Sequence, residues 1–260
     1  MTTTAATRWD PRQYGRYGDL RLRPAMELLA RVDHGAPRTV WDIGCGRGEI
    51  ARVMAERWPT ARVLGLDRSR EMLDAAEAVE ANVEGVEADV AGWTPDEPAD
   101  VIYANAVLHW IAGHDSLFPR LMESLAPEGV LAVQMPLSWD QPSHQALRET
   151  LDEGFGPDEL RRSVARRWVE EADWYYDLLR PLASYVDIWE TRYLQILEGE
   201  DPVLEWVKGT ALRPVMDALE GDELERFLEA FRARLAELYP RRPGGETLFP
   251  FARLFIVATR

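Results

Sequence analysis

The sequence predicts an α/β protein with a doubly wound, Rossmann-like sheet of seven strands, the last one antiparallel, and an inserted helical cap. Two observations support this fold class. In the first half, short and largely continuous apolar runs alternate with segments of helical periodicity, which is typical of parallel strands buried on both faces. In the second half, two strand-like segments enclose a helical stretch. Repeated strand, helix, strand patterns imply right-handed crossovers.

The first five strands are expected where apolar runs are short and bounded by turns or helical patterns. They are 39–43, 62–67, 82–88, 99–104 and 130–135. A helix over 49–58 follows a glycine-rich turn and stops before Pro59. Ser69 is the expected N-cap of a helix over 70–80, and a helix over 114–125 precedes Pro127 and a turn at 128–129.

The pattern changes after Pro136. Residues 137–183 are expected to be helical and are rich in aromatic side chains, a strand is expected over 184–197, and helices over 202–219 and 221–238 precede a final strand over 253–259. The expected organisation is an N-terminal helical arm and core over 1–136, cap segments over 137–183 and 198–247, and sheet strands within 184–197 and 248–260.

Composition excludes several classes of function. The 260 residues suffice for one large core or a core with a cap, and 46% hydrophobic and 29% charged residues are typical of a soluble protein. A net charge of −15 argues against a nucleic-acid partner but leaves room for a small anion bound by a few arginines. The single cysteine, Cys45, forms no internal disulfide, so a cytoplasmic setting is expected. No signal peptide or membrane span is predicted. The oligomeric state is left open, and a monomer is compatible with the sequence.

The stretch TVWDIGCGRGE, residues 39–49, ends the first strand in a glycine-rich turn. In a doubly wound sheet, ligands bind where such turns leave the carboxyl ends of the strands. The spacing is Gly-x-Gly-x-Gly rather than the dinucleotide pattern Gly-x-Gly-x-x-Gly. Asp42 precedes the glycines and Glu49 follows them, which disfavours a pyrophosphate and suits a ligand with a cationic amino-acid end. A tight turn without a ligand is the alternative.

Acids also follow the second and third strands. Asp67 lies about twenty residues beyond the glycines, where a carboxylate accepts hydrogen bonds from ribose hydroxyls. This position fits a nucleoside without distinguishing NAD from S-adenosylmethionine, and it also fits an acid stabilised by a helix N-terminus. Asp89 follows the third strand, where it can accept a hydrogen bond from an adenine amino group. Together with Asp42, these acids at three successive strand ends indicate a nucleoside cofactor.

The motifs WDIGCGRGE, GLD and EADV together resemble those of the class I S-adenosylmethionine-dependent methyltransferases. The resemblance implies a cofactor site that is built from several strand ends. Its residues would be Asp42 near the methionine end, Gly44 and Gly46 in the loop, Asp67 at the ribose, Met72 beside the adenine, Asp89 and Val90 at the adenine edge, and Asn105 next to the cofactor. Relatives often have proline and asparagine where this chain has Arg47 and Glu49, so no side-chain contacts are carried over there.

Segments outside the cofactor half resemble the trans-aconitate 2-methyltransferase family. They include WDPRQYGRYGDLRLRPA (9–25), ANAVLHW (104–110), LAPEGVLAVQMP (125–136), YYDLL (175–179), VDIWETRYLQIL (186–197), EWVKGTALRP (205–214) and FARLFIVATR (251–260). One departure is Ala211, where glycine is expected. The resemblance implies methyl transfer from S-adenosylmethionine to a carboxylate of trans-aconitate, or a similar small polycarboxylate, with S-adenosylhomocysteine as product.

The implied chemistry requires positioning rather than acid–base catalysis. A carboxylate is already ionised at neutral pH, so no general base is needed. Proximity, alignment and desolvation should supply the rate. His109 and Trp110 follow the fourth strand at the rim of the expected site, and we expect them to position the reactants. The alternative for His109 is a histidine at the rim without chemical function. Trp110 is expected to form a wall of the site.

Arginine forks suit the carboxylates of the substrate. Arg213, in the cap, is the first candidate; the others are Arg253, at the start of the last strand, and Arg21 and Arg23 in the N-terminal segment. Each of these arginines could instead serve as a surface charge or a salt-bridge partner. The aromatic candidates for the substrate pocket are Tyr14, Trp139, Tyr175 and Tyr176. Ordinary packing explains the aromatic residues equally well. No cluster has metal-ligand spacing, so no metal is expected.

Three rival functions remain open. The nearest is an S-adenosylmethionine-dependent O-methyltransferase that acts on another small acid or a natural product. A nicotinamide-dependent oxidoreductase is disfavoured by the glycine spacing and by Asp42. A noncatalytic protein that binds S-adenosylmethionine is the third, and the arginine-bearing cap argues against it.

Overall fold

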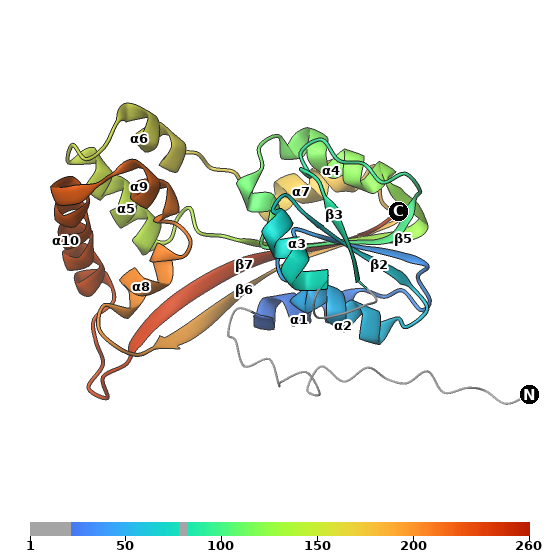
Figure 1. The fold of residues 1–260 in the computed structure, drawn as a ribbon, viewed down its shortest axis with the longest axis horizontal. Coiled ribbons are helices and arrows are strands. Elements are labelled where there is room, and N and C mark those ends of the chain that lie inside the picture. Colours follow the sequence, from blue (N-terminus) through green and yellow to red (C-terminus); the bar gives the residue numbers. More distant parts are fainter. Residues whose placement is uncertain (1–21, 78–82) are drawn as a thin grey trace, which may run out of the picture. The chain divides into compact units, whose positions relative to one another are not determined.

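In the computed structural model, residues 22–77 and 83–260 are described, and their strands form one seven-stranded sheet with the order β3-β2-β1-β4-β5-β7-β6 (Figure 1). The strands are β1 (Thr39–Ile43), β2 (Arg62–Asp67), β3 (Val83–Glu87), β4 (Ala99–Asn105), β5 (Leu125–Pro136), β6 (Tyr185–Leu197) and β7 (Thr247–Thr259). The pairs β1–β2, β1–β4, β2–β3 and β4–β5 are parallel. The predicted doubly wound α/β fold is confirmed.

The last strand runs antiparallel to β5, as predicted. The Arg260 N–H donates to the Gly129 carbonyl at 3.0 Å, and the Leu137 N–H donates to the Ala252 carbonyl at 3.0 Å. Residue numbers therefore decrease along β7 in the direction in which they increase along β5, which defines an antiparallel pair. In the sheet order, β7 lies between β5 and β6 rather than at an edge.

The described chain divides into two compact units. The first holds the described residues up to Met135, with Glu170–Glu190 and Leu254–Arg260; the second holds Pro136–Val169 and Thr191–Arg253. The helices are α1 (Leu22–Arg31), α2 (Glu49–Arg57), α3 (Arg70–Glu77), α4 (His114–Glu123), α5 (Pro142–Asp152), α6 (Asp158–Val164), α7 (Ala172–Leu179), α8 (Pro202–Lys208), α9 (Arg213–Ala218) and α10 (Gly221–Leu238), with a 3₁₀ turn, η2, at Leu108–Trp110. No described helix is both long enough and apolar enough to cross a membrane.

In the first unit, helices cover both faces of the sheet. Figure 1 shows α1 and α2 on one side, and α4 packed against α7 on the other. The central strand β4 is buried along nearly its whole length, as expected for a continuous apolar run. Tyr103 on β4 is fully buried, and its hydroxyl donates to the Ala25 carbonyl at 2.7 Å, which ties the strand to α1. Burial and the negative charge of Asp42 raise the pKa of this phenol, so it stays a neutral donor.

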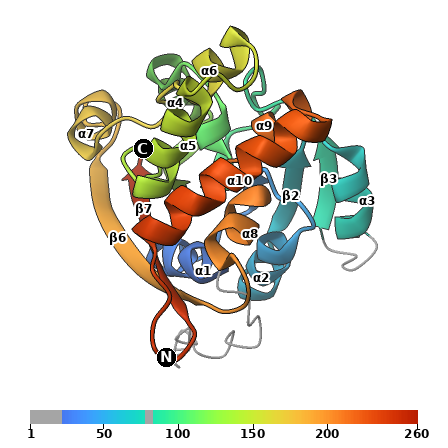
Figure 2. The same cartoon turned by 90° about the vertical axis from the view of Figure 1, so that its left-hand side faces the viewer.

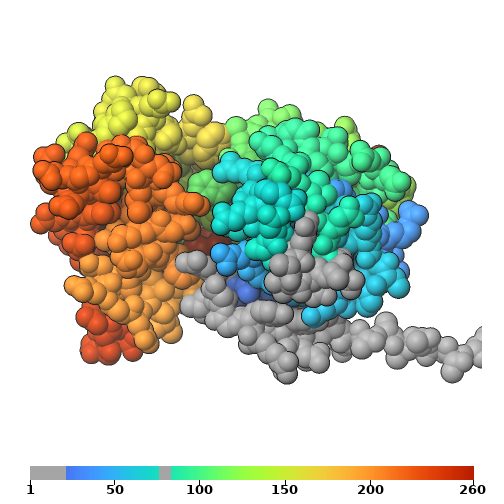
Figure 3. Space-filling view, viewed as in Figure 1, coloured from blue at the N-terminus to red at the C-terminus, as the bar shows by residue number. Residues whose placement is uncertain are grey.

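The second unit has its own apolar core. Helix α10 packs on α5 and α8, as Figure 2 shows, and presents Phe227, Phe231 and Leu235 to the interior. Their spacing of four residues places them on one helix face, which explains the burial. In the space-filling view of Figure 3, the surface of segment 142–164 (yellow-green) meets that of segment 202–238 (orange to red). Segments from distant parts of the chain therefore form this unit together.

Some element boundaries differ from those expected. The single helix expected over 202–219 is two helices. Gly209 follows the last residue of α8, and Pro214, which lacks an N–H, lies in the first turn of α9. The turn expected at 128–129 is an irregularity within β5: Glu128 has a left-handed φ of 63°, and the register with β4 shifts there. Strand β5 therefore begins at Leu125, and β7 begins at Thr247 rather than at 253. Residues 78–82, which include the expected end of one helix and start of one strand, lie outside the described residues.

Candidate active site

The glycine loop connects β1 to α2 with a left-handed backbone. Gly44 has a φ of 69°, and a Cβ placed on it would lie 2.5 Å from Val107 Cγ2. Gly46 has a φ of 55°, but a Cβ there would meet no atom within 4 Å, so the loop backbone is open to a ligand at that point. The Gly44 and Cys45 N–H groups donate to the Leu66 carbonyl at 2.7 and 3.0 Å. Steric contact and strain thus require glycine at 44, and open space at 46 permits close approach.

Asp67 holds the glycine loop in place. Its Oδ2 accepts a hydrogen bond from the Gly46 N–H at 3.0 Å, and its Oδ1 accepts one from the Ser69 N–H at 2.9 Å. A carboxylate has about four lone-pair positions, so two remain for ligand hydroxyls. Ser69 caps α3 as predicted, because its Oγ accepts from the Met72 N–H at 3.3 Å.

Asp42, at the end of β1, is a buried carboxylate with only 3% exposure. Burial raises its pKa to about 8; a backbone hydrogen bond from Ala51 opposes this shift, and the charges of Glu49 and Asp67 add to it. Among the described residues, Asp42 Oδ2 has no hydrogen-bond partner. A buried carboxylate oxygen without a partner is destabilising unless a cation or donor satisfies it, so this site suits a cationic ligand group.

The adenine-side candidates lie after β3 and on α3. Asp89 is exposed, and its Oδ1 accepts from the Ala91 N–H at 2.9 Å, which shapes a local turn. Val90 is buried, and its carbonyl accepts from Arg120 Nη2 at 2.8 Å. Met72 is exposed near the start of α3. The structure shows no hydrogen bond or ion pair that joins Met72 to Asp89 or Val90, so their common role stays a prediction.

Unpartnered polar atoms also gather at the carboxyl ends of β4 and β5. Asn105 pairs in register with Gln134, whose side chain is only 1% exposed. Neither Asn105 Oδ1 nor the Oε1 and Nε2 atoms of Gln134 have a hydrogen-bond partner in the described part of the chain. Asp42 pairs in register with Tyr103, and Tyr103 and Asn105 are two residues apart on β4. Alternation along strands therefore puts Asp42, Asn105 and Gln134 on one face of the sheet.

Gln134 is a candidate that sequence reasoning missed. It lies inside the segment LAVQMP, which otherwise has the continuous apolar pattern of a buried strand. The available signal was a polar amide near the carboxyl end of that strand, where ligands of such sheets bind.

The turn η2 carries His109 and Trp110, the expected positioning residues. Their rings lie 4.6 Å apart between centroids, and Trp110 is 55% exposed. His114 contacts this turn and links it to Tyr175. Its Nε2 lies 3.0 Å from the Leu108 carbonyl oxygen, and its Nδ1 lies 2.6 Å from the Tyr175 hydroxyl. Because a carbonyl only accepts, we assign the proton to Nε2, so that Nδ1 accepts from the tyrosine. Burial lowers the pKa of His114, which favours this neutral form.

Tyr175 lies inside the first unit rather than at its surface. Its side chain is fully buried, and its hydroxyl also accepts from the Glu170 N–H at 3.2 Å. A buried phenol with these two contacts supports the η2 turn through His114. Tyr176, the next residue, is 46% exposed. Tyr14 lies outside the described residues.

In the second unit, Arg253 is a buried cation. It is 8% exposed, its Nε has no partner among the described residues, and its guanidinium carbon lies 3.8 Å from the ring centroid of Phe251. Burial lowers its pKa to about 9, with a smaller opposing effect of Tyr193, so it remains charged at neutral pH. A buried guanidinium with a free donor suits a carboxylate ligand.

The other candidates of the second unit are distributed over different elements. Trp139 makes a cation–π contact with Arg148, whose guanidinium carbon lies 4.1 Å from the centroid of the indole ring. Arg148 Nη2 also donates to the Trp139 carbonyl at 3.0 Å. Nearby, burial and the charge of Arg148 lower the pKa of His144 to about 4. Arg213 is exposed at the first residue of α9, and the structure shows no hydrogen bond or ring contact that joins it to Arg253 or Trp139.

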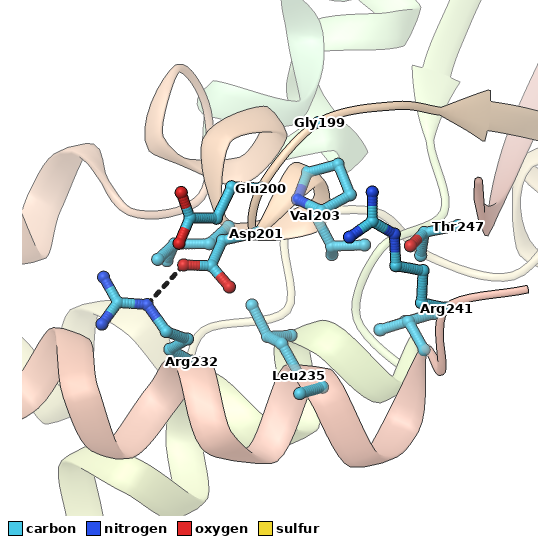
Figure 4. Close-up of a pocket in the computed structure, with 12 residues that line it drawn as sticks. Gly199, Glu200, Asp201, Val203, Arg232, Leu235, Arg241 and Thr247 are labelled. Atoms are coloured by element: carbon cyan, nitrogen blue, oxygen red, sulfur yellow. Dashed lines mark ion pairs between the residues drawn. The ribbon is translucent and has the colours of Figure 1, made fainter. Parts of the chain in front are cut away.

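A cavity of about 200 Å³ lies in the second unit between the loop after β6 and α10 (Figure 4). Arg232 pairs with Asp201 at 2.6 Å across it, and Arg241 Nε donates to the Gly245 carbonyl at 2.7 Å. These cations already have partners within the protein, and no predicted site residue lines the cavity. It is therefore not the candidate active site.

Neither metal nor thiol chemistry has a candidate group in the described residues. No group of three or more His, Cys, Asp or Glu side chains within 22–77 and 83–260 is arranged to hold a metal. Cys45 is buried, and a Cβ on Gly65 would lie 2.7 Å from its Sγ, so the thiol packs against β2. Burial raises its pKa, with added effects of Asp42 and Asp67, which disfavours the nucleophilic thiolate.

Comparison with known proteins shows both family and fold. Residues 14–187 match a family model described as a methyltransferase domain. The trans-aconitate 2-methyltransferase of Acidovorax ebreus is 46% identical over 253 residues, which are 97% of this chain and 98% of that protein. The trans-aconitate 2-methyltransferase of Streptomyces avermitilis is 44% identical over 263 residues, covering 98% of this chain and 97% of that protein.

Solved structures with the same fold are more distant in sequence. The YcgJ protein of Bacillus subtilis has a TM-score of 0.58 at 15% identity, covering 91% of this chain and 97% of that one. Haemonchus contortus phosphoethanolamine N-methyltransferase 2, in complex with S-adenosyl-L-methionine, has a TM-score of 0.51 at 16% identity, covering 90% and 52%. At such identities, the likeness concerns the fold.

Proposed function

The chain belongs to the trans-aconitate 2-methyltransferase family, and on this premise we propose that it esterifies a carboxylate of trans-aconitate, giving a monomethyl ester and S-adenosylhomocysteine. It is an S-adenosylmethionine-dependent methyltransferase. The observation that carries the acceptor class is Arg253, a buried cation with an unpartnered donor. Burying an unpaired cation lowers stability. Binding of an anionic substrate by this cation explains why a protein of net charge −15 keeps it buried.

The residues at the first strand ends fit the cofactor. Asp42 offers an unpartnered carboxylate to the amino group of the methionine end, and the open backbone at Gly46 permits close approach. Asp67 keeps lone pairs for the ribose hydroxyls while it holds the loop. The full proposed set is Asp42, Gly44, Gly46, Asp67, Met72, Asp89, Val90 and Asn105.

Bound S-adenosylmethionine would supply a methyl group activated by a sulfonium, so that a carboxylate oxygen of the acceptor would attack the methyl carbon in line and S-adenosylhomocysteine would leave. The protein needs no general base for this step, because the carboxylate is already ionised. Its residues bind the two reactants, align them and exclude water. His109 and Trp110, held on the η2 turn by His114 and Tyr175, are the proposed positioning residues.

The proposed substrate residues have different parts. Arg253 ranks first as a carboxylate ligand, and Arg213, exposed on α9, is the second cation. Trp139 and Tyr176 are proposed as walls of the pocket, as is Tyr14, while Tyr175 acts through His114. The expected cytoplasmic setting and the expected lack of nucleic-acid or membrane partners remain predictions, which Cys45 and the net charge support.

The test is a methyl-transfer assay with labelled S-adenosylmethionine over a panel of di- and tricarboxylic acids and phenols. We expect trans-aconitate to be the preferred acceptor, with an alkali-labile product typical of an ester. Methylation of another acid or a phenol in its place would favour the alternative O-methyltransferase. Calorimetric titration with S-adenosylmethionine and with NAD checks the cofactor, and binding of NAD alone would contradict the proposal.

A further inference from the structure

Gln134 is buried at the carboxyl end of β5 without any hydrogen-bond partner. Both its Oε1 and its Nε2 are unpartnered among the described residues, although the side chain is 1% exposed. An amide buried in this way loses its hydrogen bonds to water on folding and regains none, which is rare in folded proteins. Such a group is therefore expected to have a partner that is not part of the described chain, and a bound ligand is the natural one.

The position of Gln134 in the sheet indicates which ligand. Asp89, Asp67 and Asp42 are the acids proposed for adenine, ribose and methionine. Asp89 follows β3, whereas Asp67 and Asp42 lie at the ends of β2 and β1, and the three strands are neighbours in that order. The sheet then continues to β4 and β5. Neighbouring strands lie about 4.8 Å apart, so Gln134 lies roughly 10 Å beyond Asp42, away from the adenine side. The reactive methyl is on the sulfonium, between the ribose and the amino-acid end of the cofactor. The acceptor must therefore approach it from a side that the cofactor leaves open, within about 3.5 Å of the methyl carbon, and the ends of β4 and β5 provide that side.

We propose that Gln134, which pairs in register with Asn105 of the proposed cofactor set, binds the reacting carboxylate of the acceptor by donating a side-chain N–H to one of its oxygens. This inference rests on the proposed function, because it presumes a carboxylate acceptor. A neutral amide orients the nucleophile without neutralising its charge, whereas a direct ion pair with arginine would reduce its nucleophilicity. The second carboxylate oxygen, which carries no such bond, forms the new bond to the methyl carbon while the methyl–sulfur bond breaks, its electron pair stays on sulfur, and S-adenosylhomocysteine leaves.

The backbone around this pair is fixed. Ala106 follows Asn105 with a left-handed φ of 53°, a conformation that a non-glycine residue rarely adopts. Its N–H donates to the Gln134 carbonyl at 2.9 Å, and Val107 packs against Gly44. Strained residues held by their surroundings are common at functional sites. The contact ties the ends of β4 and β5 together, so the two amides keep their relative position.

The test uses Gln134→Met, which keeps the length of the side chain and removes its hydrogen bonds. We expect kcat/KM for the acceptor to fall about tenfold to a hundredfold, the loss typical of one hydrogen bond to a charged group. Affinity for S-adenosylhomocysteine, measured by calorimetry, should stay within about twofold of the wild type. Unchanged kcat/KM would overturn the proposal. An equal loss of S-adenosylhomocysteine affinity would also overturn it, since Gln134 would then bind the cofactor.

A second variant separates binding from folding. Gln134→Glu keeps the shape but places a charge against the carboxylate, so activity should be low at neutral pH. It should recover as the pH falls and the new side chain regains an O–H donor, while the wild type shows no such recovery. The same loss at every pH would contradict the proposal. If the wild type methylates an acid other than trans-aconitate, the proposed substrate fails, and the Gln134 comparison is made with that acid.

Discussion

At the residue scale, Asp42 links the cofactor site to the pH dependence of stability. Burial raises its pKa from 3.8 to about 8, so the folded protein binds a proton that the unfolded chain releases between these values. Stability contributed by this proton is therefore present below about pH 4 and is lost as the pH rises through about 8. His144, whose pKa is lowered to about 4, acts in the opposite direction, so the effect of Asp42 must be isolated by substitution.

We predict that Asp42→Asn makes the unliganded protein more stable than the wild type, by a margin that grows as the pH rises from about 5 to 8. The amide needs no proton to remain neutral in its buried position. Urea unfolding of both proteins at several pH values measures the difference. A difference that is constant with pH would show that Asp42 does not titrate in this range.

Arg253 is the second residue whose charge is kept in the interior. We predict that Arg253→Met leaves the free energy of unfolding equal or higher, because an unpaired buried cation is replaced by an apolar side chain. The KM for the carboxylate substrate should rise about tenfold to a hundredfold through loss of a charge-assisted hydrogen bond. Thermal unfolding and steady-state kinetics check both. A large fall in stability with an unchanged KM would show that Arg253 has a structural role.

At the scale of elements, the contact between the glycine loop and the segment after β4 controls the geometry of the site. Gly44 has a positive φ and no space for a Cβ beside Val107. We predict that Gly44→Ala destabilises the protein by about 1–3 kcal/mol through strain and overpacking. Urea unfolding measures this loss, and S-adenosylhomocysteine titration measures the displacement of the loop.

Val107→Gly provides the matched control, because it removes the Cγ2, Cβ and Cγ1 atoms that the new methyl group would meet at 2.5, 2.6 and 3.0 Å. In the double variant the steric part of the loss should be relieved, giving a favourable coupling between the two positions. Simple additivity would mean that the backbone conformation of Gly44, rather than its contact with Val107, determines the loss.

Elements also differ in how far local sequence defines them. Strands β1 and β2 and helix α10 have the expected boundaries, because their apolar patterns end at glycine, proline or charged residues. The break between α8 and α9 and the irregularity at Glu128 were not predicted. The break between the helices depends on the combined effect of Gly209 after α8 and Pro214 in the first turn of α9. The irregularity at Glu128 depends on the pairing of β5 with β4.

At the scale of the whole molecule, the net charge of −15 opposes the approach of an anionic substrate. We predict that kcat/KM for trans-aconitate increases when the ionic strength rises from about 0.01 to 0.15 M. Long-range repulsion is screened over that range, since the Debye length falls from about 30 to 8 Å, while a buried contact such as that of Arg253 is screened less. Initial rates at low substrate concentration measure this effect. A steep decrease with salt would mean that exposed cations dominate substrate capture.

The order of the strands along the chain, the glycine loop and the acids at three strand ends could all be predicted from the sequence. These features depend on local periodicity and on the rule that parallel strands present their carboxyl ends at one edge. Residues outside that rule were harder to interpret: Gln134 looked like part of an apolar strand, and Tyr175 like a pocket residue.

The surroundings of each side chain became known from the folded chain alone. It showed that Gln134 and Arg253 are buried with unpartnered donors, that the Tyr175 hydroxyl contacts His114, and that β7 lies between β5 and β6. The physical reason is that burial and hydrogen-bond satisfaction depend on neighbours distant in the sequence. A polar residue is a candidate ligand group only when those neighbours exclude water from it and leave its donors unpaired.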